Sequence, residues 1–263
     1  MSERSAREEG GIARNVWVGY LAMCLGMFMA ILDIQIVASS LPDIQAALHL
    51  PMERLSWIQT AYLIAEIIAI PLTGWFTRLL SLRGLFLASV TTFTIASIGC
   101  ALSQNFLALL AFRSIQGFCG GAMIPAVFTG VFVLFPERLQ LRATTIAGAF
   151  AMLAPTLGPI LGGYITETYS WPWLFLINVW PGLLAAGLAL RFLSTPPADR
   201  SAMERLDWPS LCLLALSLAS LQLGLKEAPE RGWNDPAALS ILATALVSGS
   251  LLDRKSTRLN SSH

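Results

Sequence analysis

Long apolar runs dominate the chain, and few polar positions fall inside each of them. A helix that crosses a bilayer needs about 20 mostly apolar residues. Eight runs qualify as candidate membrane-spanning helices by that measure: residues 16–41, 56–77, 84–103, 106–134, 141–164, 172–193, 208–225 and 237–252. The pattern therefore predicts an all-α, polytopic membrane protein.

The composition supports this class. Of the 263 residues, 55% are hydrophobic and 13% are charged, whereas a soluble domain has about 25% charged residues. The net charge of +1 gives no basic excess for binding nucleic acid. Neither Lys226 nor Lys255 follows a glycine, so the chain lacks the Gly-Lys-Ser/Thr loop that would bind ATP phosphates.

The cysteines and histidines do not support metal or cofactor chemistry. We interpret the cysteines, which lie inside apolar runs at wide spacing, as small buried hydrophobes: Cys24, Cys100, Cys119 and Cys212. His49 and His263 lie outside the runs. We therefore expect no metal and no cofactor. An intramembrane enzyme, which needs a nucleophile with a base or a metal inside the membrane, is the disfavoured alternative.

Positive charges predict the orientation. The first run is too long for a cleaved signal peptide and contains Asp33, so we interpret it as a signal anchor after a cytoplasmic segment, residues 1–15. With the N-terminus inside, ten arginines fall on the cytoplasmic side: Arg4, Arg7, Arg14, Arg78, Arg83, Arg138, Arg142, Arg191, Arg200 and Arg205. Only three basic residues fall outside: Arg54, Lys226 and Arg231. This bias is typical of the positive-inside rule.

The polar segment 194–207 divides the chain. It separates a six-helix block, residues 16–193, from two further helices, residues 208–252. The last apolar run has 16 residues and reaches only about 24 Å before "DRKSTRLNSSH". That ending is either a short cytoplasmic tail or, as we favour, a non-native segment, residues 253–263, that follows a helix cut short.

Three ionisable residues lie inside predicted spans, where such groups are costly and usually functional. They are Asp33, Glu66 and Arg113. Counted from the outer end of each helix, all three lie about 12–15 Å deep, because a helix rises about 1.5 Å per residue. Two acids and one base on three helices therefore share one level, where they could meet.

Helical spacing groups these residues with other polar side chains. On the second helix one narrow stripe contains Gln59, Tyr62, Glu66 and Thr73. On the fourth helix one side contains Arg113, Gln116, Gly117 and Gly120. The arrangement is either an ion pair that only fixes packing or a proton site, since burial disfavours a charged carboxylate and a nearby arginine favours it.

The stretch "APTLGPILGG", residues 154–163, places prolines and glycines inside an apolar run. A stripe about 80° wide collects most of the small residues: Thr144, Gly148, Ala151, Pro155, Gly158 and Gly162. Small residues let helices approach closely in lipid, and neighbouring helices can satisfy the backbone groups that proline frees. We interpret the stretch as a bendable, close-packing face. The alternative is an ordinary small-residue contact.

Four motifs in order resemble those of the major facilitator superfamily, specifically the fourteen-helix drug:proton antiporters of the EmrB/QacA type. "LDIQIVASSLP" (32–42) resembles the first-helix motif with its aspartate, and "RSIQGFCGG" (113–121) the fourth-helix R-x-x-Q-G motif. "WPWLFLINVWPG" (171–182) resembles the entry to the sixth helix. "APTLGPILGG" resembles the antiporter motif of the fifth helix, with Gly158, Pro159, Gly162 and Gly163 matching.

The loop after the second helix departs from the family pattern G-x-L-a-D-r-x-G-r-R/K. "GWFTRLLSLR" keeps Gly74 and Arg83. It has Arg78 in place of the aspartate and Ser81 in place of the second glycine. The charge relay of this loop with neighbouring helices is therefore in question.

The resemblance implies a fold of two inverted three-helix repeats, followed by the start of a linker. It implies proton-coupled export of hydrophobic drugs by alternating access across a bacterial inner membrane, in some relatives with a periplasmic adaptor protein, and no nucleic-acid partner. Asp33 and Arg113 would couple protons, and Glu66 would bind a proton or a cationic substrate. The cavity would be lined by Gln59, Tyr62, Glu66 and Gln116, and the hinge formed by Pro155, Gly158, Pro159, Gly162 and Gly163. A truncated, inert fragment is the alternative, because the family also uses a second six-helix bundle.

Overall fold

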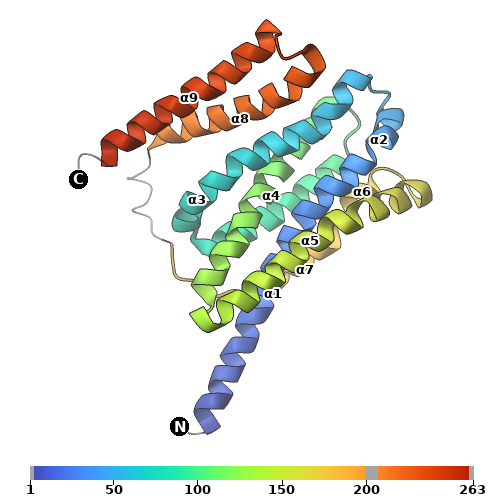
Figure 1. Cartoon of the computed structure of the whole chain (residues 1–263). Coiled ribbons are helices and arrows are strands. Elements are labelled where there is room, and N and C mark those ends of the chain that lie inside the picture. The colour runs from blue at the N-terminus through green and yellow to red at the C-terminus, as the bar shows by residue number, and fades with distance from the viewer. Residues whose placement is uncertain (1–2, 199–206, 261–263) are drawn as a thin grey trace.

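The computed structural model describes residues 3–198 and 207–260, which contain nine helices and no strand. The helices follow the chain in order (Figure 1): α1 (Glu3–Ser39), α2 (Leu41–Leu48), α3 (Met52–Ala101), α4 (Phe106–Leu134), α5 (Glu137–Thr168), α6 (Trp173–Leu176), α7 (Val179–Phe192), α8 (Trp208–Arg231) and α9 (Pro236–Asn260). Parts of the predicted N-terminal segment, linker and tail, at residues 1–2, 199–206 and 261–263, lie outside the described residues.

Each of the eight predicted apolar runs is helical over most of its length. Six described helices are long and apolar enough to cross a membrane, and Pro236–Leu252 forms a shorter apolar helix. One of the six, α3, has 50 residues. Because that length is about 75 Å, more than twice the apolar thickness of a bilayer, α3 comprises two spans. They join at Ser81, whose backbone is not helical.

Two helix ends differ from the sequence prediction. The first helix begins at Glu3 and not near residue 16, so part of the predicted cytoplasmic segment is helical. The last helix continues to Asn260, beyond the predicted end of the apolar run at residue 252 and into the polar tail. Apolar periodicity marks where a helix meets lipid or protein, and it does not mark where the backbone stops being helical.

Two further elements were not predicted. The short helix α2 follows the first span, with Pro42 in its first turn and Ile44 buried, and it ends at His49 in the left-handed conformation. The sixth run is divided into α6 and α7 by a turn at Ile177 and Asn178. Eight and four residues are too few for a periodic pattern to reveal a separate helix.

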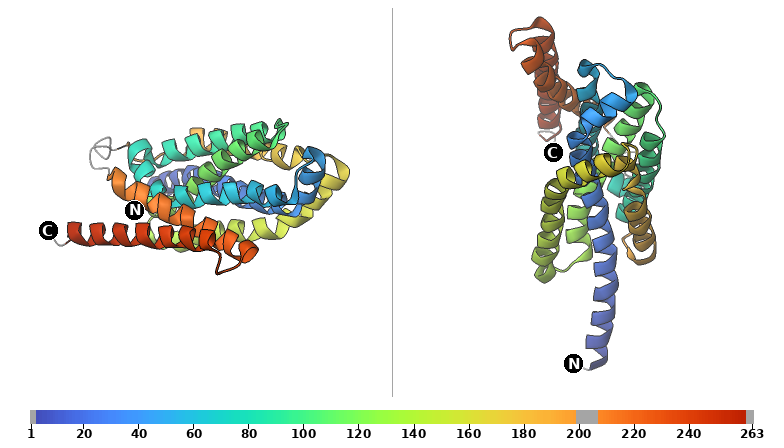
Figure 2. Two further views of the ribbon diagram at one scale, coloured as in Figure 1. Left: turned by 90° about the horizontal axis from the view of Figure 1, so that it is seen from above. Right: turned by 90° about the vertical axis from the view of Figure 1, so that its right-hand side faces the viewer.

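Helices α1, α3, α4, α5 and α7 pack side by side in one bundle, while α8 and α9 form a hairpin that contacts the bundle through α3 (Figure 1). The two halves of α3 pack closely against α4, and α1 packs against α5, α7 and α4. The N-terminal part of α1 projects beyond the other helices (Figure 2). The bundle therefore surrounds the middle of α1.

Two apolar clusters fill the bundle. One contains Met29 and Ala30 of α1 together with Phe86 and Met123. The other begins at Leu32 on the same helix. Asp33 therefore lies near the boundary between the two clusters.

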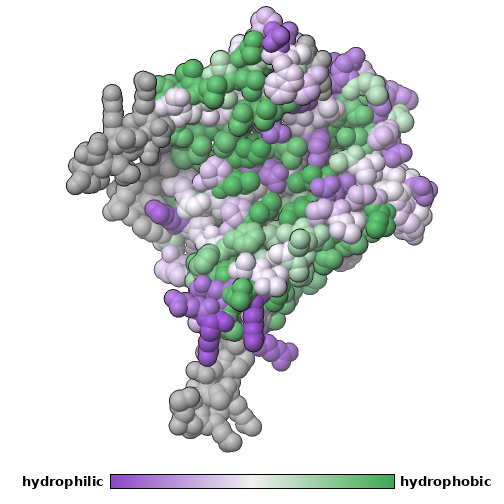
Figure 3. Space-filling view, in the orientation of Figure 1, coloured by the Kyte–Doolittle hydropathy of each residue, from purple (hydrophilic) through white to green (hydrophobic). Residues whose placement is uncertain are grey.

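The outer surface is apolar over most of the bundle. Hydrophobic residues spread across the body of the face in Figure 3, and hydrophilic ones gather most densely at the end from which α1 projects. Large side chains are exposed on several helices, among them Ile95, Phe132, Met152 and Trp180. Such a surface is suited to contact with lipid.

Candidate functional site

Asp33 and Arg113 form an ion pair in the middle of the bundle. Arg113 Nη1 donates to Asp33 Oδ2, and both side chains are 0% exposed. The pair links α1 to α4, two helices whose polar residues were predicted to share one depth. Breaking a buried pair by removing one partner leaves an unpaired charge, which costs about 3–5 kcal/mol.

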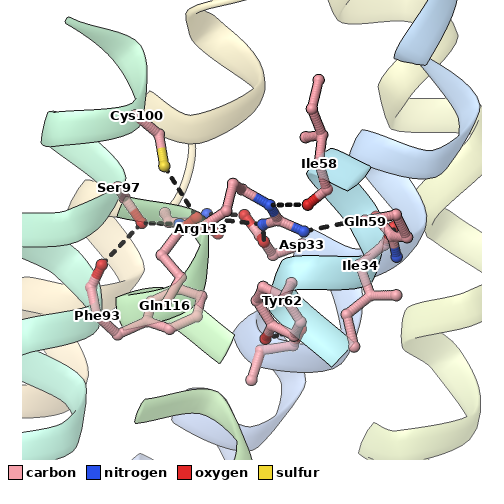
Figure 4. Close-up of polar contacts among 12 residues, drawn as sticks. Asp33, Ile34, Ile58, Gln59, Tyr62, Phe93, Ser97, Cys100, Arg113 and Gln116 are labelled. Atoms are coloured by element: carbon pink, nitrogen blue, oxygen red, sulfur yellow. Dashed lines mark hydrogen bonds and ion pairs between the residues drawn. The ribbon is translucent and has the colours of Figure 1, made fainter. Parts of the chain in front are cut away.

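Arg113 has neutral acceptors in addition to the carboxylate (Figure 4). Its Nη1 donates to Gln116 Oε1 at 3.1 Å, its Nη2 to Gln59 Oε1 at 3.5 Å and its Nε to the Ile58 carbonyl at 3.4 Å. The Tyr62 ring centre lies 4.3 Å from the guanidinium carbon, within the range of a cation–π contact. The guanidinium is therefore held from several sides even without Asp33.

The second oxygen of Asp33 has a partner that sequence reasoning missed. Asn178 Nδ2 donates to Asp33 Oδ1 at 2.7 Å, and Asn178 is buried. The signal that could have found it is an amide inside an otherwise apolar span, in the motif already noted at residues 171–182. Both carboxylate oxygens thus accept a hydrogen bond.

Gln116 extends the network to the second half of α3. Its Nε2 donates to Ser97 Oγ at 2.8 Å, and Ser97 in turn donates to the Phe93 carbonyl. Cys100 Sγ lies 3.1 Å from Gln116 Oε1 and donates to it. Cys100 is therefore buried as predicted, but it acts as a donor within a polar network and not only as a hydrophobe.

The polar stripe on α3 faces α1. Gln59 Nε2 donates to the Ile34 carbonyl at 3.3 Å, and the Tyr62 hydroxyl donates to the Ala30 carbonyl at 3.1 Å. Tyr62 is fully buried. In this arrangement the stripe fastens α3 to the backbone of α1 on either side of Asp33.

Glu66 lies one turn further along α3 and does not join the ion pair. It is buried, at 8% exposure. Among the contacts of the described residues, it has neither an ion pair nor a side-chain hydrogen bond. Of the three ionisable residues predicted to share one depth, Asp33 and Arg113 are in contact, and Glu66 is not.

Two glycines of the fourth-helix motif let α4 approach the backbone of α3. A Cβ atom at Gly117 would overlap the Tyr62 backbone, and one at Gly121 would overlap the Glu66 backbone. This close approach places Arg113, one turn before Gly117, beside the α3 stripe. The motif therefore has a direct packing explanation.

The stretch 154–163 meets α1, although with only part of the predicted stripe. Gly158 and Gly162 pack so closely against Gln35 and Ser39 of α1 that a Cβ atom would overlap them. The buried face of α5 comprises Ala143, Ala147, Ala154, Gly158, Gly162 and Ile165. It is rotated by roughly 50° from the predicted stripe, because alanines pack as closely as glycines do.

The remaining members of the predicted stripe and motif do not contact α1 in this way. Thr144, Pro155 and Pro159 are exposed, and a Cβ atom at Gly148 or Gly163 would meet open space. Both prolines lie within the continuous helix α5. A hinge at these positions remains a prediction.

The loop motif after the second span contributes one clear contact. Arg83 Nη2 donates to the Leu190 carbonyl at 2.7 Å, near the end of α7, and the Arg83 backbone N–H donates to Thr195 Oγ1. Gly74 and Arg78 are exposed. Arg83 therefore joins the start of the third span to the end of the sixth.

Ser81 occupies a conformation that favours glycine. Its φ of 64° and ψ of 160° lie in a region that non-glycine residues enter only with strain. Its Oγ accepts the Gly84 N–H at 3.2 Å, so it caps the helix that follows. This is the position where the family pattern has its second glycine.

Comparison with known proteins assigns the family. A family model described as Major Facilitator Superfamily matches residues 23–253. The chain belongs to the major facilitator superfamily. The resemblance of the four motifs is thereby confirmed, and the chain is a multi-pass membrane protein of all-α fold.

The relatives of the chain include a colistin resistance protein and a multidrug export protein. The chain is 40% identical over 240 residues to the colistin resistance protein EmrB of Acinetobacter baumannii, covering 91% of the chain and 47% of that protein. It is 34% identical over 227 residues to the multidrug export protein EmrB of Escherichia coli K12, covering 86% and 44%. The chain thus spans about half the length of these relatives.

Solved structures support the fold. The proton:xylose symporter XylE aligns with a TM-score of 0.62 at 14% identity, covering 83% of this chain and 55% of that one. A bacterial homologue of the lysosomal transporter Spinster aligns with a TM-score of 0.56 at 18% identity, covering 76% and 49%. At this identity the likeness concerns the superfamily fold alone.

Proposed function

We propose that the chain forms the N-terminal six-helix bundle and two following helices of a proton-coupled multidrug exporter. The observation that carries the proposal is the fully buried ion pair of Asp33 and Arg113. Buried charges inside a membrane are rare and usually mark ion or substrate pathways. The names of the EmrB relatives support multidrug export.

In this proposal a proton and Arg113 compete for the carboxylate of Asp33. A charged Asp33 is stabilised by the guanidinium of Arg113 and the amide of Asn178. A proton that binds to Asp33 removes the attraction and frees α1 to separate from α4. When the pair forms again, Asp33 releases the proton to the opposite side.

Arg113 is expected to stay in place when Asp33 binds and releases a proton. Its contacts with Gln59, Gln116 and the Ile58 carbonyl do not depend on Asp33. We therefore assign the movement to α1, which carries the carboxylate. Since Gly158 and Gly162 pack on α1, α5 would move with it and provide the bending or sealing expected of the Pro155 to Gly163 stretch.

Glu66 is proposed as the group that binds a second proton or a cationic substrate. Its carboxyl group is buried near the polar network and forms no hydrogen bond or ion pair with the described residues of that network. Separation of α1 from α3 would also expose Gln59 and Tyr62, which now bond to α1 carbonyls. These side chains and Gln116 would then line the substrate cavity.

The proposed orientation, membrane and partner protein of the exporter rest on the charge distribution and on the resemblance to the family. Ten basic residues against three favour a cytoplasmic N-terminus. The relatives' bacterial sources support an inner-membrane location. A periplasmic adaptor protein is a further proposed partner on the resemblance alone.

Asp33→Asn tests the proposal in the complete transporter that contains these residues. Inside-out membrane vesicles are loaded with a pH gradient, and accumulation of ethidium, a fluorescent hydrophobic cation, is followed. We expect Asp33→Asn to abolish gradient-driven accumulation. Asp43→Asn, the same change on the exposed first turn of α2, is expected to retain it. Undiminished proton-driven transport by Asp33→Asn would overturn the proposal.

A further inference from the structure

Asn178 occupies a position that delivers its side chain to Asp33. It lies in the turn between α6 and α7, and its backbone N–H donates to the Phe175 carbonyl while its carbonyl accepts the Gly182 N–H. Its backbone groups are therefore already satisfied. The side-chain amide is therefore available to bond to Asp33, and its Nδ2 donates a hydrogen bond to Asp33 Oδ1 at 2.7 Å.

The turn itself is held firmly against the bundle. Gly182, one turn after Asn178, packs so closely on α3 that a Cβ atom would overlap Thr94 Oγ1. Leu174 and Phe175 before the turn are fully buried. The turn that carries Asn178 is thus fixed relative to α3, while the side-chain amide bonds to a residue of α1.

The two partners of Asp33 differ in what they can bond. A guanidinium has donors only, so Arg113 can stabilise a carboxylate but cannot accept a hydrogen bond from a protonated acid. An asparagine has both an NH₂ group and a carbonyl oxygen. Rotation of the amide would let Asn178 donate to the charged form and accept from the neutral form.

We propose that Asn178 is a positioning residue that holds the Asp33 carboxyl group in both protonation states and sets the pH range of coupling. The inference rests on the proposed function, because it needs Asp33 to exchange protons. The other charged or titratable groups that act on Asp33 are Arg113 on α4 and Tyr62 and Cys100 on α3, while Glu66 acts on Tyr62 and Arg113. Within the described parts of α5, α6 and α7, no ionisable side chain is seen to act on Asp33.

Asn178→Leu removes the hydrogen bond while keeping a side chain of similar size. Asn178 bonds more strongly to the charged carboxylate than to the neutral acid, so the loss of both bonds shifts the protonation midpoint upward by the difference, about 1 pH unit. Purified full-length transporter is titrated, and the infrared carbonyl stretch of the protonated carboxyl group is followed. The Asp33→Asn variant identifies the band that belongs to Asp33. We expect the midpoint of that band, and the pH of half-maximal transport, to move upward together in Asn178→Leu.

Two variants separate positioning from packing. Asn178→Gln keeps an amide and is expected to shift the midpoint by less than Asn178→Leu does. Thr94→Val alters the α3–α7 contact without touching Asp33 and is expected to leave the midpoint unchanged. If Asn178→Leu does not accumulate in the membrane, Asn178→Ala, which cannot overpack, replaces it in the same titration.

The outcomes distinguish this inference from the proposed function. An unchanged midpoint in Asn178→Leu, with transport still abolished by Asp33→Asn, would overturn the role of Asn178 alone. Equal shifts in Asn178→Leu and Thr94→Val would also overturn it, because they would assign the effect to packing. Proton-driven transport by Asp33→Asn would instead remove the proposed function.

Discussion

Loss of Arg113 should make the stability of the protein depend on pH in a way that loss of Asp33 does not. In Arg113→Gln the Asp33 carboxyl group keeps only a neutral partner, Asn178. An acid in that position can escape its unpaired charge by taking a proton. In Asp33→Asn the guanidinium remains charged at any accessible pH, because arginine does not lose its proton in proteins.

The size of the effect follows from the number of protons bound. An exposed aspartate loses its proton near pH 4. Because the buried Asp33 of folded Arg113→Gln lacks a charged partner, it keeps its proton to higher pH than that, and above about pH 4 the folded protein binds up to one more proton at Asp33 than the unfolded chain does. The free energy of unfolding then rises as the pH falls, by up to about 1.4 kcal/mol per pH unit. From pH 7 to pH 5 the gain is at most about 2.7 kcal/mol, it is smaller relative to the wild type by whatever proton uptake wild-type Asp33 shows, and it is fully present below pH 4.

Unfolding of the purified full-length protein in detergent, measured at pH 5, 6 and 7, gives this dependence. Arg78→Gln, the same replacement at an exposed position, controls for a general effect of removing an arginine, and the wild type controls for other titrating groups. Asp33→Asn should be destabilised by about 3–5 kcal/mol with no added pH slope. A slope in Arg113→Gln no steeper than in Arg78→Gln would refute the reasoning.

Three further predictions concern single positions. Ser81→Gly should stabilise the protein by about 1 kcal/mol in a thermal unfolding assay, because glycine relieves the backbone strain. Ser81→Ala should destabilise it by a similar amount, because alanine keeps the strain and loses the helix cap. Gly121→Ala should cost about 1–3 kcal/mol, because the added methyl group overlaps the Glu66 backbone; Gly148→Ala, which meets open space, should unfold as the wild type does. Glu66→Gln should reduce export of cationic drugs more than of neutral ones in vesicle assays, and an equal loss would point to coupling or folding instead.

The sequence was sufficient for the spans and for the central ion pair. Apolar runs locate helices because each must fill a fixed thickness of lipid. Depth along those helices placed Asp33 and Arg113 on one level, and they meet. Depth does not specify the rotation or tilt of each helix, and so Glu66, which has the same predicted depth, lies apart from the pair.

The parts that sequence reasoning missed depend on backbone detail. The turn that delivers Asn178 to Asp33 interrupts a long, predominantly apolar run, so the mean hydropathy of the run gives no sign of the turn. The packed face of α5 was misplaced because Ala154 was not counted with the glycines. The strained conformation at Ser81 could be suspected only from the family's glycine at that position.

Four glycines bring the helices of the bundle together in two closely packed pairs. Gly117 and Gly121 join α4 to α3, while Gly158 and Gly162 join α5 to α1. Since the glycine in each contact has no side chain that could adapt, we expect each joined pair of helices to move as a single rigid unit. Asp33 belongs to the α1–α5 pair and Arg113 to the α3–α4 pair. A proton that breaks the ion pair would therefore allow these two rigid pairs of helices to move relative to each other. Spin labels placed on α4 and α5 should therefore change their distance with pH, whereas labels placed on α3 and α4 should not.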